Sequence, residues 1–228
     1  MFNYNTQSVP VATRRWTPRR IRLAGLAAIV GALLLVAHIM WGTYHAIVGS
    51  VPGYMTVGTG AYYLSEGTLF VAWVGIFLGF AALRARLLGL ESRLWNVGSA
   101  LATIGAALAA IGFAIATIAP AVGATGVVDP ANMIIGLGLM VGITLGSFLM
   151  GIALFRTGAA SRLLAGLLVL VLPMTLLAGP VGEALGVGSW VMLAMIAPLV
   201  AAVIVIGHSL RTETPETIER EPLPDSAA

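Results

Sequence analysis

Long uncharged apolar stretches alternate along this chain with short polar segments that hold the charges. A run of about 20 apolar residues is long enough to cross the hydrocarbon core of a bilayer as an α-helix. The pattern therefore predicts an all-α fold, a polytopic transmembrane helix bundle with six spans. The predicted spans are residues 21–44, 62–83, 96–119, 132–155, 163–178 and 189–208. The fifth is the shortest and holds Pro173, so its outer end is the boundary that the pattern defines least.

Composition supports a lipid environment. Only 9% of the 228 residues are charged and 59% are hydrophobic, whereas a soluble domain carries about 25% charged residues. Six spans and their connections leave no room for a separate soluble domain. The chain has no Cys, which excludes disulfides, thiolate metal sites, iron–sulfur clusters and Cys nucleophiles.

The basic residues define an orientation. All twelve are Arg, and in the six-span scheme they all fall on one side of the membrane. Because Arg-rich loops stay in the cytoplasm, the scheme predicts that both termini are cytoplasmic, in the plasma (inner) membrane of a prokaryote. This topology accounts for the net positive charge without a nucleic-acid partner. The Arg residues are Arg14, Arg15, Arg19, Arg20, Arg22, Arg84, Arg86, Arg93, Arg156, Arg162, Arg211 and Arg220.

The two ends of the chain differ in character from the predicted transmembrane domain at 21–210. Residues 1–20 form a basic tail and residues 211–228 a polar tail with three prolines. Both have too little apolar surface to bury, so we expect them to be mobile. The first apolar run is long enough to span and is read as a retained helix rather than a cleaved signal. Aromatic residues fall at the predicted outer interface, among them Trp41, Tyr44 and Tyr62.

Small residues form stripes on three predicted helices. Gly138, Gly142 and Gly146 recur every fourth residue on the fourth helix, and Gly75 and Gly79 do so on the second. Residues four apart share a helix face, so the stripes allow helix backbones to approach closely. A third stripe on residues 96–119 consists of Gly98, Ala102, Ala106 and Ala110. The stripes predict packing inside one bundle; the alternative is a homo-oligomer interface on the fourth helix.

One weak cluster of polar residues is a candidate for chemistry. Glu66 is the only acid that falls inside a predicted span, and an intramembrane carboxylate is a functional hypothesis by default. His38 reaches a similar depth on the preceding helix, and His45 lies two turns further out on the same face. These three could form an outward-facing pocket that relays protons, binds a cation or coordinates a metal. Asp129 and Glu183 fall on the same outer side.

The alternative interpretation of this cluster is structural. Ser65 could cap the second helix, with Glu66 in its first turn in the wet interface and His38 as a hydrogen-bonded bundle residue. No catalytic residue and no cofactor is predicted. The two histidines of the first helix do not face one another as haem ligands would. The chain also has no phosphate-binding loop, zinc-protease motif or nucleophile elbow.

The turn between the fourth and fifth helices carries a resemblance. The run at residues 151–168, GIALFRTGAASRLLAGLL, resembles the inner hairpin of a broad group of uncharacterised six-helix integral membrane proteins from GC-rich prokaryotes. The resemblance implies a six-helix fold and no particular activity. The matching residues are Arg156, Arg162, Ala165 and Gly166, whereas Ser161 stands where that group tends to have Pro.

Two functions follow from these observations. The smooth small-residue stripes, short loops and scarce polar residues favour a non-catalytic accessory or scaffold subunit of a membrane assembly, in contact with lipid and with a membrane protein partner. The alternative is a small ion- or proton-coupled permease that uses His38 and Glu66. A membrane enzyme ranks last, because no nucleophile or metal motif is present.

Overall fold

The computed structural model describes residues 16–48, 56–185 and 188–212, and within these it contains helices and turns but no strand. Helix α1 is Pro18–Ile47, α2 is Gly60–Arg86 and α3 is Arg93–Ala121. A continuous helical segment at Thr125–Thr157, which we call the fourth rod, follows. Helices α6 (Arg162–Leu185) and α7 (Gly188–Thr212) complete the chain. The fourth rod consists of η3 (Thr125–Val127), α4 (Val128–Leu137), η4 (Gly138–Leu145) and α5 (Gly146–Thr157).

The all-helical character predicted from hydropathy is confirmed, because each predicted span lies within one helical segment. In the described residues, five of these segments are long and apolar enough to cross a membrane. The sixth, α6, has a shorter described apolar part at Arg162–Leu177. The chain therefore has the architecture of a helical membrane protein.

One predicted boundary is wrong. The fifth span was expected to end at residue 178, but α6 continues to Leu185 with both Pro173 and Pro180 inside the helix. A proline removes one backbone hydrogen bond, and helices in apolar surroundings tolerate this by local adjustment. Gly179 and Pro180 therefore belong to the helix and not to the turn after it.

Hydroxyl side chains cap the N-termini of most of the helices. Thr17 Oγ1 accepts a hydrogen bond from the Arg20 N–H at 3.3 Å, with Pro18 in the first turn. Thr59 Oγ1 accepts one from the Tyr62 N–H at 3.1 Å and begins α2. The alternative that Ser65 caps this helix is therefore wrong: α2 begins at Gly60, two residues before the predicted span and five residues before Ser65.

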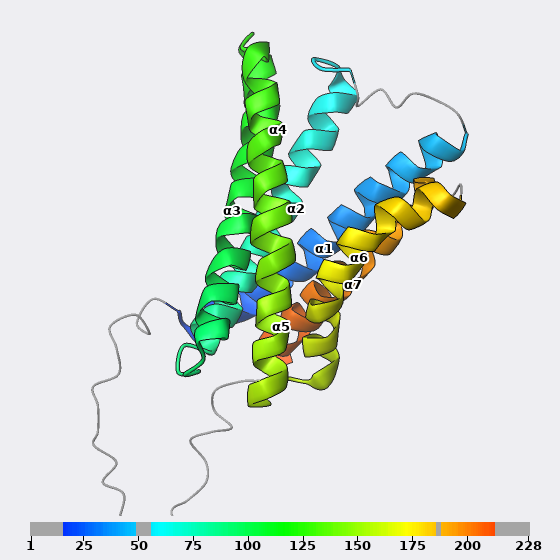
Figure 1. Cartoon of the computed structure of the whole chain (residues 1–228). Helices are drawn as coiled ribbons and strands as arrows, with labels where there is room; N and C mark the ends of the chain where they lie inside the picture. Colours follow the sequence, from blue (N-terminus) through cyan, green and yellow to red (C-terminus); the bar gives the residue numbers. More distant parts are fainter. Residues whose placement is uncertain (1–15, 49–55, 186–187, 213–228) are drawn as a thin grey trace, which may run out of the picture.

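The helices pack as a closed ring in the order α1, α2, α3, fourth rod, α6, α7 and back to α1 (Figure 1). In Figure 1, α1, α6 and α7 run together at a tilt to α3 and the fourth rod, and the two groups diverge toward one end. Large apolar side chains fill the centre of the ring. The most deeply buried include Ile76, Phe80, Met150, Leu168 and Ile206.

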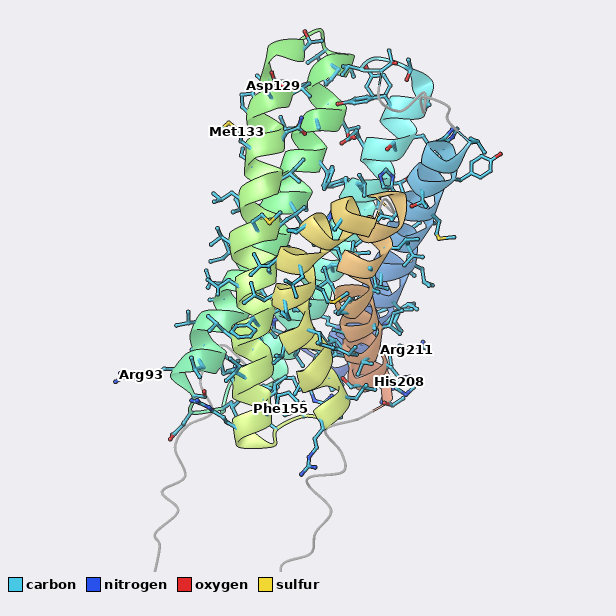
Figure 2. All side chains as sticks on the ribbon, turned by 45° about the vertical axis from the view of Figure 1, so that its right-hand side comes forward. Arg93, Asp129, Met133, Phe155, His208 and Arg211 are labelled. Carbon is cyan, nitrogen blue, oxygen red and sulfur yellow. The ribbon has the colours of Figure 1, made fainter. Side chains whose placement is uncertain are left out.

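The arginines gather at one end of the bundle. Figure 2 shows Arg93, Phe155 and Arg211 at the same end, and Asp129 with Met133 at the opposite end. At the arginine end, Arg86 Nη1 donates a hydrogen bond to the Ser209 carbonyl at 3.0 Å and joins α2 to α7. The first turn of α1 and the last turn of α7 lie there too, since Gly25 faces Gly207 and Arg211.

The glycine stripes of the fourth rod and α2 lie inside the bundle. A Cβ added at Gly142 or Gly146 would meet backbone atoms of α3, namely those of Gly105 and Ala102. Gly138 faces the Gly105 carbonyl in the same way. On α2, Gly75 faces the backbone of Ala27 on α1 and Gly79 faces Ala28. The fourth-rod stripe is therefore covered by α3 and is not available to a second copy of the chain.

These contacts predict opposite effects for two glycines of the fourth rod. Gly142→Ala should lower the free energy of unfolding by about 1–3 kcal/mol, because the methyl group collides with the Gly105 backbone. Gly136→Ala meets open space and should leave stability unchanged or raise it by up to about 1 kcal/mol through helix propensity. Unfolding in mixed micelles, followed by circular dichroism, measures both. Equal effects of the two substitutions would contradict this packing.

Candidate functional site

His38 of α1 lies against Ser65 of α2. The His38 Nδ1 atom is 3.4 Å from the Ser65 hydroxyl oxygen, and the ring tautomer decides which group donates. Ser65 is fully buried, with 1% of its surface exposed, and His38 is half-buried. Because α1 and α2 are neighbours along their length, this contact joins them near the end opposite the arginines.

Glu66 adjoins this contact. It is half-buried and lies in the second turn of α2, because the helix begins at Gly60. Successive residues on a helix point about 100° apart, so Ser65 turns toward α1 while Glu66 points elsewhere, on the side of α2 that it shares with Tyr62. The structure thus brings His38 to the residue beside Glu66. The His38–Glu66 pairing itself stays a prediction.

A second hydrogen bond at this level joins α2 to α3. The Tyr62 O–H donates to the Ala116 carbonyl at 3.0 Å, and Tyr62 is 5% exposed. Tyr63 packs edge-on against the Tyr62 ring, with ring centres 5.6 Å apart. Tyr62 is therefore a buried helix-to-helix contact, in addition to the interfacial position that the sequence indicated.

His45 lies in a different setting from His38. Its ring packs against Tyr44 with ring centres 5.6 Å apart and against Trp41 at 6.2 Å. These three rings form an aromatic cluster in the last turns of α1. His45 therefore belongs to this aromatic cluster, two turns outward from His38.

Of the two other acids predicted on the outer side, Asp129 does not extend the candidate site. Asp129 is exposed in the first turn of α4, at the end of the bundle opposite the arginines (Figure 2). The side chain of Glu183 lies outside the described residues. Within the described part of the chain, no group of three His, Asp or Glu side chains is placed to hold a metal ion. What the described residues form is a buried imidazole–hydroxyl contact with a carboxylate beside it.

No family model, curated protein or solved structure matches this chain. The function is therefore inferred from the geometry of its own residues.

The His38–Ser65 contact predicts a measurable coupling. In a double-mutant cycle of His38→Ala and Ser65→Ala, the coupling free energy should be about 0.5–1.5 kcal/mol, the net value of a buried hydrogen bond. The matched control is the cycle of His45→Ala with Ser65→Ala, which should show no coupling beyond about 0.5 kcal/mol. Unfolding in mixed micelles provides the four free energies of each cycle. Coupling of the same size in both cycles would show that the contact is not specific.

Proposed function

We propose that this chain is a six-span protein of a prokaryotic plasma (inner) membrane with both termini in the cytoplasm, and that it serves as a non-catalytic accessory or scaffold subunit. The antiparallel ring supports the topology, because it brings the described Arg residues to one end of the bundle. Arg-rich ends stay cytoplasmic. The proposed membership of a six-helix group from GC-rich prokaryotes agrees with this arrangement.

The topology is testable because the chain has no Cys. Gly126 and Gly89 are both exposed, and an added side chain meets nothing within 4 Å at either. With Gly126→Cys, a membrane-impermeant thiol reagent should label intact cells; with Gly89→Cys, labelling should require lysis. The reverse pattern would show that the arginine end faces outward, and labelling of both in intact cells would exclude a membrane-embedded bundle.

The accessory role rests on one surface, a groove along the flank of α2 and α3 with a volume of about 650 Å³. All its walls are apolar. Phe70, Val74 and Phe77 of α2 form one wall. The other wall is formed by α3 and includes the small residues Ala107, Ala110 and Ala114. We call this surface the flank groove. It continues outward along α3 past Ile118 and Ala119 to Val122 and Ala124.

The shape of the flank groove fits a partner's membrane-spanning helix with large apolar side chains. In lipid, helices associate by van der Waals contact, and alanines allow a second backbone to approach. Ridges on one helix fill grooves between neighbouring helices in the same way. The groove runs along a span, so a partner helix would pack along it rather than across it.

Filling the flank groove should remove the partner. With Ala114→Trp, an apolar ring would occupy the groove, and we expect at least a tenfold loss of the protein that co-purifies with the chain from its native membrane in mild detergent. Ala37→Trp is the matched control, since Ala37 is exposed on α1, away from the groove, and it should retain the partner.

Two outcomes would contradict the accessory role. One is a chain that purifies without a stoichiometric protein partner. The other is a partner that stays bound to Ala114→Trp as tightly as to Ala37→Trp. A chain that purifies with lipid in the groove and no protein partner would also contradict the accessory role.

A second candidate function, a small ion- or proton-coupled permease, has one observation in its favour. The imidazole of His38 meets a buried hydroxyl beside a half-buried carboxylate, and imidazole ordinarily changes charge between pH 5 and 8. The co-purification result separates the two functions. A lone protein whose phenotype is lost with Glu66→Gln favours the permease, and a stoichiometric partner with an unaffected Glu66→Gln phenotype favours the subunit.

A further inference from the structure

A small cavity lies among four helices of the ring, apart from the flank groove and from the His38–Ser65 contact. Its volume is about 100 Å³, and α2, η4, α6 and α7 supply its walls. Three of its lining residues carry polar side-chain atoms, namely Trp73, Thr144 and Thr175. We call this space the central cavity. The other lining residues are Leu139, Met140, Ile143, Val171, Met195, Ile196 and Leu199.

The central cavity lies at the mid-height of the bundle. Its tryptophan and two threonines are each about 20 Å from the arginine ends of their helices, at a rise of 1.5 Å per residue. A bilayer with its headgroups is about 40–45 Å thick. The cavity is therefore close to the bilayer midplane, the depth at which membrane proteins with interrupted helices place their binding sites.

Three of the four helical walls have irregular backbone bonding at this height. Segment η4 is π-helical over Gly138–Leu145 and includes four of the lining residues. Pro173 lies inside α6 between Val171 and Thr175, and Pro198 lies inside α7 next to Leu199. Single π-helical turns occur frequently at functional sites, and interrupted backbone at membrane depth is tolerated where it lines a cavity.

Both threonines that line the cavity use their hydroxyl protons within their own helices. Thr144 Oγ1 donates its proton to the Leu139 carbonyl at 3.0 Å, and Thr175 Oγ1 donates to the Val171 carbonyl at 2.7 Å. A hydroxyl has one donor and two acceptor lone pairs. With the donors used within the helices, only lone pairs remain for an occupant, so the occupant must donate hydrogen bonds.

A third hydroxyl nearby lacks a partner. Ser147 is fully buried, and its Oγ atom has no hydrogen bond. It lies one turn from Ile143 and Thr144, both of which line the cavity, and therefore on the same side of the fourth rod. A buried hydroxyl left unsatisfied costs about 1–3 kcal/mol. Ser147 does not itself line the cavity, and its Oγ is closed to solvent, so an occupant of the cavity does not reach it.

We propose that the central cavity is a binding site for a small uncharged hydrogen-bond donor, with water as its resident occupant. A volume of about 100 Å³ holds roughly three waters at ~30 Å³ each. None of the residues that line it is ionisable, so a charged ligand would have no counter-charge in the low-dielectric interior. The site does not depend on the accessory role, because the central cavity shares no lining residue with the flank groove.

The test uses the full-length chain with Trp73 as its only tryptophan, obtained by replacing the other four with Phe. Water near Trp73 should increase its emission in D2O relative to H2O. Thr144→Val with Thr175→Val removes the acceptors without a large change in shape, and should reduce this increase by at least half and shift emission to shorter wavelength. The matched control is Thr103→Val with Thr117→Val, which removes hydroxyls of α3 that bond to their own helix in the same way.

A second comparison holds even if the valine variants fail to fold. A chain with Trp95 alone reports on a tryptophan that is 1% exposed and does not line the central cavity. The D2O increase for Trp73 should exceed that for Trp95. The proposal is overturned if the two tryptophans respond alike, if the Thr144 and Thr175 substitutions act no differently from the control pair, or if xenon binds the wild-type cavity as it binds dry apolar ones.

Discussion

Contact between helix backbones at glycine is the interaction on which the ring depends. Within hydrocarbon there is no water to expel between helices, so association relies on close van der Waals approach. Gly31 meets Gly75 where α1 crosses α2, and Gly105 meets Gly142 where α3 crosses the fourth rod. Gly25 meets Gly207 where α1 packs against α7, and Gly151 of α5 meets the backbone of α6. Each of these interfaces therefore has a point at which any side chain would separate the pair.

The same constraint gives a reason for the π-helical segment. Residues four apart on an α-helix rotate about 40° further with each step, so a glycine stripe drifts away from a straight partner. In a π-helical segment the i→i+5 bonding makes the turn wider, each residue rotates less, and the drift is offset. Gly138, Gly142 and Gly146 thus stay toward α3. The wider turn also places Thr144 against the Leu139 carbonyl, five residues back, at the wall of the central cavity.

Hydropathy and arginine placement were sufficient to predict the helices and the end at which the arginines gather, because both depend on composition within one segment. The end of α6 was not predictable in this way, since Pro180 stops a helix in water but is tolerated inside a helix that lies in apolar surroundings. The His38–Ser65 contact depends on helix register. If Gly31 of α1 is placed against Gly75 of α2, seven residues toward the outer end lead to His38 on α1 and to Thr68 on α2. Thr68 lies one turn from Ser65, the residue that His38 contacts. The central cavity needs all four walls and has no signal in the sequence beyond the two prolines.

The distance between the outer polar contact and the central cavity bears on both proposed functions. Ser65 and Trp73 lie on α2 about 12 Å apart along the helix axis. Leu69 lies between them and is buried, with 7% of its surface exposed. A polar solute that moved from one to the other would have to displace this apolar layer, whereas an accessory subunit needs no such movement. Leu69 is therefore the point at which a static subunit and a permease differ physically: in the first its side chain stays packed, and in the second it must move.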